Sequence, residues 1–413
     1  MSDAPPRSSA SRSALGGIVA AGISSATNFV AVVFAARNGS PASFGAVSLG
    51  FTAYLLAQSV TRALVGEMLL IGSDPHDHRA TRLGVTATIV TALPIAAVTA
   101  IIGLAMPSDG PTQPVMFVLA ACIVPLCVLD TFRYVAFSRS TPLRAAGIDL
   151  AWAACFIVGL LAFGGELTSF DVWVAWCVGG AIVGVGGTAA TRALCAPGSA
   201  TAWMRENLTT SGRYIIENVT SQSVNGIALF ALGALAGTAA VGAVRGVSTL
   251  FGPLTVLYSG VYAGLLSRLR QHESNRARIL RVVSLGLVGA ALFATVFWLV
   301  VPTGFGTALL GDTWASARAL VVPFGIGTAI TVAAGGALIG LRMLVAASTT
   351  LRIRLICAPI TLALLVAGSA WSAQQGYAIG FVISSVIATG LLWFGYRQVQ
   401  RNGAPEPAPD PAT

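Results

Sequence analysis

Residues 83–105 read LGVTATIVTALPIAAVTAIIGLA and contain no charged side chain. An α-helix needs about 20 apolar residues to cross the hydrocarbon core of a bilayer, and this run is long enough. Similar runs recur along the whole chain, so we predict membrane spans over residues 14–36, 43–71, 83–105, 114–138, 145–163, 171–194, 211–235, 239–266, 280–302, 316–340, 355–371 and 377–396. The pattern predicts an all-α polytopic membrane protein with about twelve transmembrane helices.

The composition excludes a soluble fold. Of the 413 residues, 55% are hydrophobic and only 9% are charged, whereas soluble domains carry about 25% charged residues. The six cysteines and three histidines form no metal-binding or disulfide pattern. No nucleophile or phosphate-loop motif is present either. We therefore expect no catalytic residue, no metal and no cofactor, and we do not expect an enzyme or a nucleic-acid partner.

Arginine in the loops predicts the orientation. All 24 basic residues are arginine. With an even number of spans, almost all loop arginines fall on one side, which the positive-inside rule assigns to the cytoplasm together with both termini. The basic loop Arg268–Arg281 is then expected to attract anionic membrane lipids. The arginines on this side are Arg7, Arg12, Arg79, Arg82, Arg139, Arg144, Arg192, Arg205, Arg213, Arg268, Arg270, Arg276, Arg278, Arg281, Arg342, Arg352, Arg354, Arg397 and Arg401.

The two halves of the chain repeat each other. Five residues of the first half recur in the second half at one constant spacing: Asn28, Ala42, Gly45, Ala46 and Val47 match Asn225, Ala239, Gly242, Ala243 and Val244. Six spans separate equivalent points, so the repeats are parallel and their symmetry axis follows the membrane normal. We predict two six-helix bundles (a 6+6 repeat) around a central cavity. The expected segments are a cytoplasmic tail (1–13), the first bundle (14–194), a cytoplasmic linker (195–210), the second bundle (211–396) and a disordered cytoplasmic tail (397–413).

Four short stretches resemble bacterial polysaccharide flippases of the multidrug/oligosaccharidyl-lipid/polysaccharide exporter superfamily. They are residues 26–29 (ATNF), 39–46 (GSPASFGA), 62–67 (RALVGE) and 129–134 (LDTFRY). The resemblance implies translocation of a polyprenyl-linked saccharide across the bacterial cytoplasmic membrane by alternating access. The chain looks about two spans short of the lipid II flippases, which disfavours that subgroup.

Two arginines inside spans are candidates for binding the substrate. Charged groups in spans are costly and mark functional sites by default. Arg62 lies near the middle of its predicted span, and Arg245 lies about 10 Å from the outer end of its own. A guanidinium binds a lipid phosphate well because it is always charged and bidentate. The alternative is that each arginine pairs with a buried carboxylate or extends to an interface.

The other polar groups inside spans form two sets. Asn28 and Asn225 occupy matched positions, where they either line the cavity and bind substrate or hydrogen-bond between helices. A second set falls in the cytoplasmic half of the spans, where we predict a gate or ion-coupling network. Its members are Glu67, Asp130, Arg133, Asp149 and Glu217.

The sequence favours a flippase that supplies cell-envelope polysaccharide synthesis. It leaves H⁺ or Na⁺ open as a coupling ion, and a glycosyltransferase or polymerase open as a protein partner. A cation-coupled multidrug exporter of the same superfamily is one alternative. Carboxylates alone in the outer cavity would favour it, and none is clearly placed there. A membrane scaffold that does not transport is the other, and its cavity would hold no charge or water.

Overall fold

The computed structural model describes residues 22–23, 25–72, 78–139, 141–254, 258, 276–343 and 347–401. These residues form helices and no strand. Eight helical stretches are long and apolar enough to span a membrane, and Ser25–Arg37 and Gln222–Ala236 are shorter apolar helices. The prediction of an all-α, multi-pass, two-lobe membrane protein is confirmed. The predicted lipid-binding loop falls largely outside the described residues.

The chain forms two compact units. Unit 1 contains residues 1–226 with the short piece 309–312, and unit 2 contains residues 227–308 and 313–413. The long helix α9 (Leu208–Ala236) carries the chain from unit 1 into unit 2. The predicted bounds of the two bundles, with a linker over 195–210, stay a prediction.

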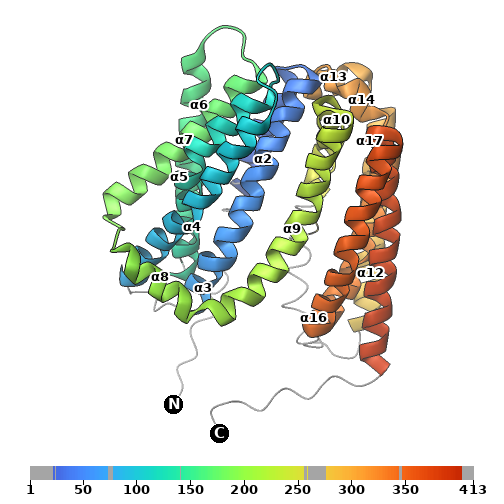
Figure 1. The fold of residues 1–413 in the computed structure, drawn as a ribbon. Helices are drawn as coiled ribbons and strands as arrows, with labels where there is room; N and C mark the ends of the chain where they lie inside the picture. Colours follow the sequence, from blue (N-terminus) through green and yellow to red (C-terminus); the bar gives the residue numbers. More distant parts are fainter. Residues whose placement is uncertain are drawn as a thin grey trace. The chain divides into compact units, whose positions relative to one another are not determined.

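Unit 1 is a bundle of apolar helices that lie side by side (Figure 1). Its members are α2 (Pro41–Thr61), η1 (Arg62–Gly66), α3 (Glu67–Gly72), α4 (His78–Ala105), α5 (Thr112–Ser138), α6 (Pro142–Phe163), α7 (Ser169–Thr191) and α8 (Pro197–Glu206). Helix α5 packs against α2, α4, α6 and α7, so it is the centre of the bundle. A residue on α5 therefore has neighbours from several spans.

Helix α8 lies within the segment predicted as a linker. It begins with Pro197, a residue suited to the first turn of a helix. Its Ala200 is fully buried, and Trp203 and Met204 pack against a cluster that includes Val65 and Leu69. This short helix covers one end of unit 1, and its ten residues were too few to stand out as a span in the sequence.

Unit 2 contains α10 (Thr238–Leu250), α12 (Arg276–Val300), α13 (Thr303–Leu310), α14 (Thr313–Arg318), α15 (Val321–Ala333), α16 (Gly335–Met343) and α17 (Ala347–Arg401). Helix α17 is two antiparallel legs, because the backbone at Ser372 and Ala373 leaves the helical region. Gly368 and Gly376 face each other across this turn, and a Cβ on either would collide with the backbone of the other. The turn separates the last two predicted spans.

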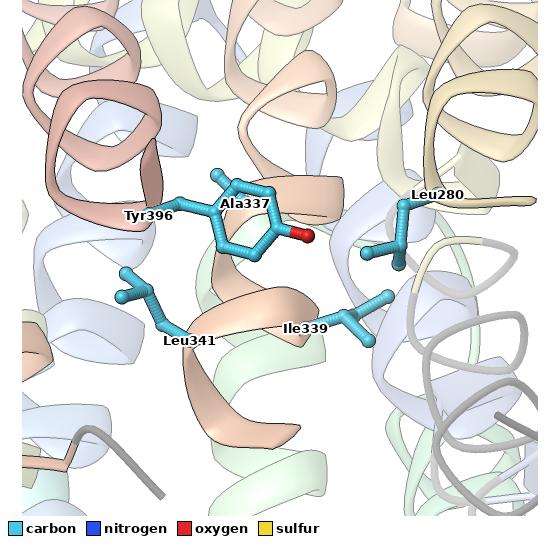
Figure 2. Packing of buried hydrophobic residues seen from close by; sticks show 5 residues of the cluster. All are labelled: Leu280, Ala337, Ile339, Leu341 and Tyr396. Atoms are coloured by element: carbon cyan, nitrogen blue, oxygen red, sulfur yellow. The ribbon is translucent and has the colours of Figure 1, made fainter. Parts of the chain in front are cut away.

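A buried cluster holds one end of unit 2 together. Figure 2 shows Leu280 from α12, Tyr396 from α17, and Ala337, Ile339 and Leu341 from α16 converging on one another. Apolar packing of this kind joins three helices, two of which are far apart in sequence. It fixes the end of unit 2 at which α12 begins and α17 ends.

The internal repeat is visible in helix boundaries. Helix α2 begins at Pro41 and α10 begins at Thr238, so Gly45 and Gly242 each occupy the fifth position of their helix. Both helices follow a sharp turn: Ser40 caps α2 by accepting a hydrogen bond from the Ser43 N–H, and Gly237 precedes α10 with φ of 81°. A positive φ of this size favours glycine, which explains the residue there.

Candidate functional site

The α2–α3 span contains a π-helical turn at Arg62. Over Arg62–Gly66 the helix widens, and the Glu67 N–H donates to the Arg62 carbonyl five residues back. The hydroxyl of Thr61 reaches the carbonyls of Ala57 (3.3 Å) and Gln58 (3.2 Å), which are acceptors that the regular helix would use. π-turns are rare and often lie at functional sites.

Arg62 forms a bidentate ion pair with Asp130 of α5. Its Nε donates to Oδ2 at 2.7 Å and its Nη2 donates to Oδ1 at 2.8 Å. The guanidinium carbon also lies 5.8 Å from the centre of the Tyr134 ring. The Asp130 side chain is 3% exposed, whereas Arg62 is 34% exposed. Bidentate geometry makes this the strongest kind of charge-assisted pair.

Arg133 joins a second aspartate to the first. Its Nη1 donates to Asp130 Oδ1 at 3.1 Å, and its Nε lies 3.2 Å from Asp149 Oδ1 on α6. Two arginines and two aspartates from three spans thus form one network with no net charge. We refer to Arg62, Asp130, Arg133 and Asp149 as the unit 1 charge network.

Asp149 is the least satisfied member of this network. Its side chain is 1% exposed, and neither carboxylate oxygen has a hydrogen-bond partner in the described part of the chain. Arg133 supplies attraction at 3.2 Å but no hydrogen bond to Asp149. A buried carboxylate without hydrogen bonds is costly, so this group is the one whose charge state is least secured.

The network lies toward one end of unit 1. This end, which we call the basic end, is where α4 and α6 begin and α5 and α7 finish, and it carries Arg79, Arg82, Arg139, Arg144 and Arg192. At a rise of 1.5 Å per residue, Asp130 and Asp149 lie roughly 10 Å from it along their helices. The opposite end carries Arg37, Asp109, Glu166 and Asp171.

Buried aromatic rings from α2 and α7 fill part of the core of unit 1. Trp173 and Trp176 stack at 5.5 Å between ring centres, and Tyr54 meets Trp176 edge-on at 5.1 Å. The Tyr54 hydroxyl accepts a hydrogen bond of 2.8 Å from the Gln58 amide. Because both tryptophans are at most 1% exposed, these rings are packing and no platform for a sugar.

Arg245 of α10 has a different environment. Its side chain is half-buried, and its Nε atom is buried with no hydrogen-bond partner in the described part of the chain. Its backbone carbonyl accepts hydrogen bonds from the hydroxyls of Ser248 (2.9 Å) and Thr249 (2.8 Å). At its place in α10, the guanidinium belongs to a residue roughly 10 Å from the start of the helix.

No carboxylate of unit 2 can pair with Arg245 among the residues that the structure describes. The acidic residues of unit 2 are Glu273, Glu406 and Asp410, and all of them lie outside the described ranges. The described part of unit 2 is therefore free of negative charge. An unpaired guanidinium inside a span is expensive unless an anion or water meets it.

The remaining predicted site residues lie on α3, on α9 and on the helix over 25–37. Glu67 is half-buried at the first position of α3, next to the π-turn. Asn28 is half-buried on the helix over 25–37, and Asn225 is exposed on α9. The side chain of Glu217 falls outside the described residues, and the described residues contain no group of three metal-binding side chains.

Comparison with known proteins identifies the fold. No protein-family profile and no curated protein matches the sequence. An inward-facing multidrug resistance MATE family transporter of the MOP superfamily aligns with a TM-score of 0.66 at 12% identity, over 93% of this chain and 98% of the other. The fold is that of the MOP-superfamily transporters.

Two further structures with this fold are similar to the chain. The lipid II flippase MurJ, in an inward closed conformation, gives a TM-score of 0.67 at 10% identity, over 93% of this chain and 89% of the other. A eukaryotic MATE transporter gives 0.57 at 16% identity, over 94% and 96%. The chain thus shares its fold both with multidrug resistance transporters and with the lipid II flippase MurJ.

Proposed function

We propose that the chain is a flippase that moves a polyprenyl-phosphate-linked saccharide across the cytoplasmic membrane by alternating access. Under this proposal the basic end of unit 1 faces the cytoplasm, as the positive-inside rule requires. The saccharide then serves cell-envelope polysaccharide synthesis. MATE transporters and the lipid II flippase share the fold, so the proposal depends on the charge of the substrate that this chain can hold.

The observation that carries the proposal is the unpaired Arg245. Its buried Nε lacks a partner among the described residues, and the described part of unit 2 contains no carboxylate. A lipid phosphate or pyrophosphate would supply both the missing charge and the missing acceptor. The planar fork of a guanidinium matches two phosphate oxygens, which a lysine could not reproduce.

Arg62 has a secondary role in this proposal. Its guanidinium already holds Asp130 through two hydrogen bonds, so it can take a phosphate only by sharing or releasing that carboxylate. Since its side chain is 34% exposed, one face of it stays accessible. We propose that Arg62 meets the phosphate transiently, after which Asp130 recaptures it.

The unit 1 charge network is our proposed coupling element. A proton on Asp149 would remove one negative charge and leave the network with a net positive charge. Arg133 would then turn fully to Asp130 and compete with Arg62 for it. Such an exchange would link uptake of a proton to release of Arg62. Glu67 directly follows the π-turn that begins at Arg62.

The test is a depletion strain of the native host that is complemented with variants and assayed for lipid-linked saccharide stranded in the inner leaflet. Arg245→Ala should abolish export while the protein stays folded and inserted, and Arg245→Lys should retain only part of it. Arg318→Ala is the matched control, because this exposed arginine of the same unit bonds the Leu299 carbonyl at 3.2 Å. Full export by Arg245→Ala would overturn the proposal.

The alternative is a cation-coupled multidrug exporter, since multidrug resistance MATE transporters share the fold. Asp149, a buried carboxylate without hydrogen bonds, is the observation that favours it. Against it, Asp149 already faces Arg133, and a cation would meet that positive charge first. Protection of cells from cationic dyes, lost in Asp149→Asn and kept in Arg245→Ala, would decide for the exporter.

A further inference from the structure

Two cavities at the basic end of unit 1 are lined by positive charge. One of about 350 Å³ is lined by His78, Arg79 and Arg82 with Cys195 and Ser199. The other, of about 230 Å³, is lined by His78, Arg82 and Arg139 with Thr81 and Thr191. His78 and Arg82 line both, so the two cavities are adjacent. None of the described residues that line them is acidic.

Hydrogen bonds hold the walls of this site in place. Arg139 Nη2 donates to the Thr81 hydroxyl at 2.8 Å, which ties the end of α5 to the first turn of α4. The Cys195 N–H donates to the Thr86 hydroxyl at 3.1 Å, which ties the segment after α7 to α4. Arg82 and Arg139 are therefore held on a fixed frame, where an anion would offset the repulsion between their guanidinium groups.

An apolar groove lies on the other side of the same wall. It has a volume of about 540 Å³ and is lined by residues of α4, α5 and α7, among them Pro125, Gly184 and Val185, with Arg192 at its end. Gly184 sits directly against Pro125, because a Cβ there would collide with the Pro125 carbonyl. The wall is the segment 188–194: Thr188, Ala189, Arg192 and Leu194 face the groove, whereas Thr191 and Ala193 face the smaller basic cavity.

The groove is open to the surroundings of the bundle. Val185 is 60% exposed and Leu194 is 54% exposed, and apolar groups exposed on a spanning helix face lipid. Pro125 precedes the end of α5 by about 20 Å along the helix. This distance is comparable to the thickness of one leaflet, which is half of a hydrocarbon core of about 30 Å.

We propose that this is a binding site for one anionic phospholipid of the leaflet at the basic end. One acyl chain occupies the groove, and the headgroup passes over the end of the wall beside Arg192, so that the phosphate binds Arg82, Arg139 and His78. An anionic phospholipid is apolar over the depth of a leaflet and negatively charged at its headgroup, so it matches both the apolar groove and the basic cavities. A soluble anion would use only the basic cavities. The site is separate from the unit 1 charge network and does not depend on the proposed substrate.

The test measures lipid retention by native mass spectrometry of the purified full-length protein in detergent. Phosphatidylglycerol should bind at least about tenfold more tightly than phosphatidylcholine, and Arg82→Gln/Arg139→Gln should lose at least about tenfold in affinity for it. Val185→Trp, which fills the groove, should lose a similar factor. The matched controls are Arg205→Gln, an exposed arginine of α8 outside both cavities, and Val158→Trp, which is 64% exposed on α6.

Four outcomes would overturn the site. They are equal affinity for the two lipids, unchanged binding by the arginine variant, equal losses in the control variants, and glycerol 3-phosphate binding as tightly as phosphatidylglycerol. A fifth concerns residues 73–77, which lie outside the described ranges and carry Asp74 and Asp77. If only Asp74→Asn/Asp77→Asn binds the lipid, these carboxylates are the natural occupants of the cavities. Melting temperatures in detergent without added lipid confirm that each variant is folded.

Discussion

The two units treat a buried arginine in opposite ways. In unit 1, Arg62 and Arg133 face Asp130 and Asp149, and the charges cancel within a few ångströms. In unit 2, Arg245 has a buried Nε without a partner, and no acidic residue is found in the part of that unit that the structure describes. The internal repeat sharpens the contrast, because the residue of α2 equivalent to Arg245 is Ser48, whose hydroxyl bonds the Phe44 carbonyl of its own helix.

The difference separates stability from binding. Breaking a buried ion pair by removing one partner leaves an uncompensated charge, so unit 1 depends on its network for stability. Arg245, which has no partner among the described residues, contributes nothing of this kind, and under the proposed function the substrate brings the negative charge that meets it. We therefore expect mutations in the unit 1 charge network to affect folding first, and mutations of Arg245 to affect transport first.

The largest expected effect is that of Asp130→Ala. It leaves Arg62 and Arg133 without their shared carboxylate, and losing one partner of a buried pair costs about 3–5 kcal/mol. We expect poor yield and a strongly lowered melting temperature in detergent. The control is Asp171→Ala at the capping box of α7, near the opposite end, where the carboxylate accepts from the Thr168 N–H and hydroxyl. Losing such a cap typically costs about 1 kcal/mol.

A second prediction introduces an ion pair at Arg245 of unit 2, of the kind that Arg62 forms in unit 1. Ser248→Glu places a carboxylate three residues after Arg245 on the same helix, within reach of an i,i+3 pair. The engineered pair should compete with the substrate phosphate, and we expect transport to fall at least about tenfold, equivalent to about 1.4 kcal/mol. Ser248→Gln, of nearly the same shape and without charge, should transport normally. Unchanged transport by Ser248→Glu would mean that Arg245 meets no anion.

The architecture was predictable from sequence because lipid imposes a strict rule. A span must satisfy its own backbone and present apolar side chains, so length and hydropathy place α4, α5, α6 and α7 within a few residues. The turn at Ser372 and Ala373 also lies between two predicted spans. Helix α8 was missed because it lies on the bundle end, where ten residues with a few apolar contacts give no membrane signal.

The candidate site was predictable only as a set of residues. Charged groups inside spans single out Arg62, Asp130, Arg133 and Asp149, and the i,i+3 spacing links Asp130 to Arg133. That Arg62 reaches Asp130 from another span depends on tertiary packing and on the π-turn, which no local pattern announces. The basic cavities and their groove were also invisible, because Arg82, Arg139 and Arg192 are brought together from three different helices.

A third prediction concerns Asp149→Asn. Neither carboxylate oxygen makes a hydrogen bond in the described part of the chain, so the loss in stability should be about 1–3 kcal/mol, less than for Asp130→Ala. The network then carries a permanent net positive charge, as it would with a proton on Asp149. If this group couples transport, the variant should no longer respond to an imposed proton gradient in proteoliposomes. An unaltered response would move the coupling role to another residue, and Glu67 would be tested next.

The smallest expected effect is the most discriminating, because it applies one substitution to both units. Arg245→Met removes a guanidinium that has no partner among the described residues, and methionine fills a similar volume without the cost of burying a charge. We expect its free energy of unfolding to stay within about 1 kcal/mol of wild type or to rise, since apolar replacement of buried charge is often neutral or stabilising. Arg62→Met should instead destabilise the protein, because Asp130 keeps only the 3.1 Å contact to Arg133. Urea or thermal unfolding in the same detergent measures both variants. If Arg245→Met destabilises as much as Arg62→Met, then Arg245 has a structural partner in the protein, and the case for an anionic substrate loses the observation on which it stands.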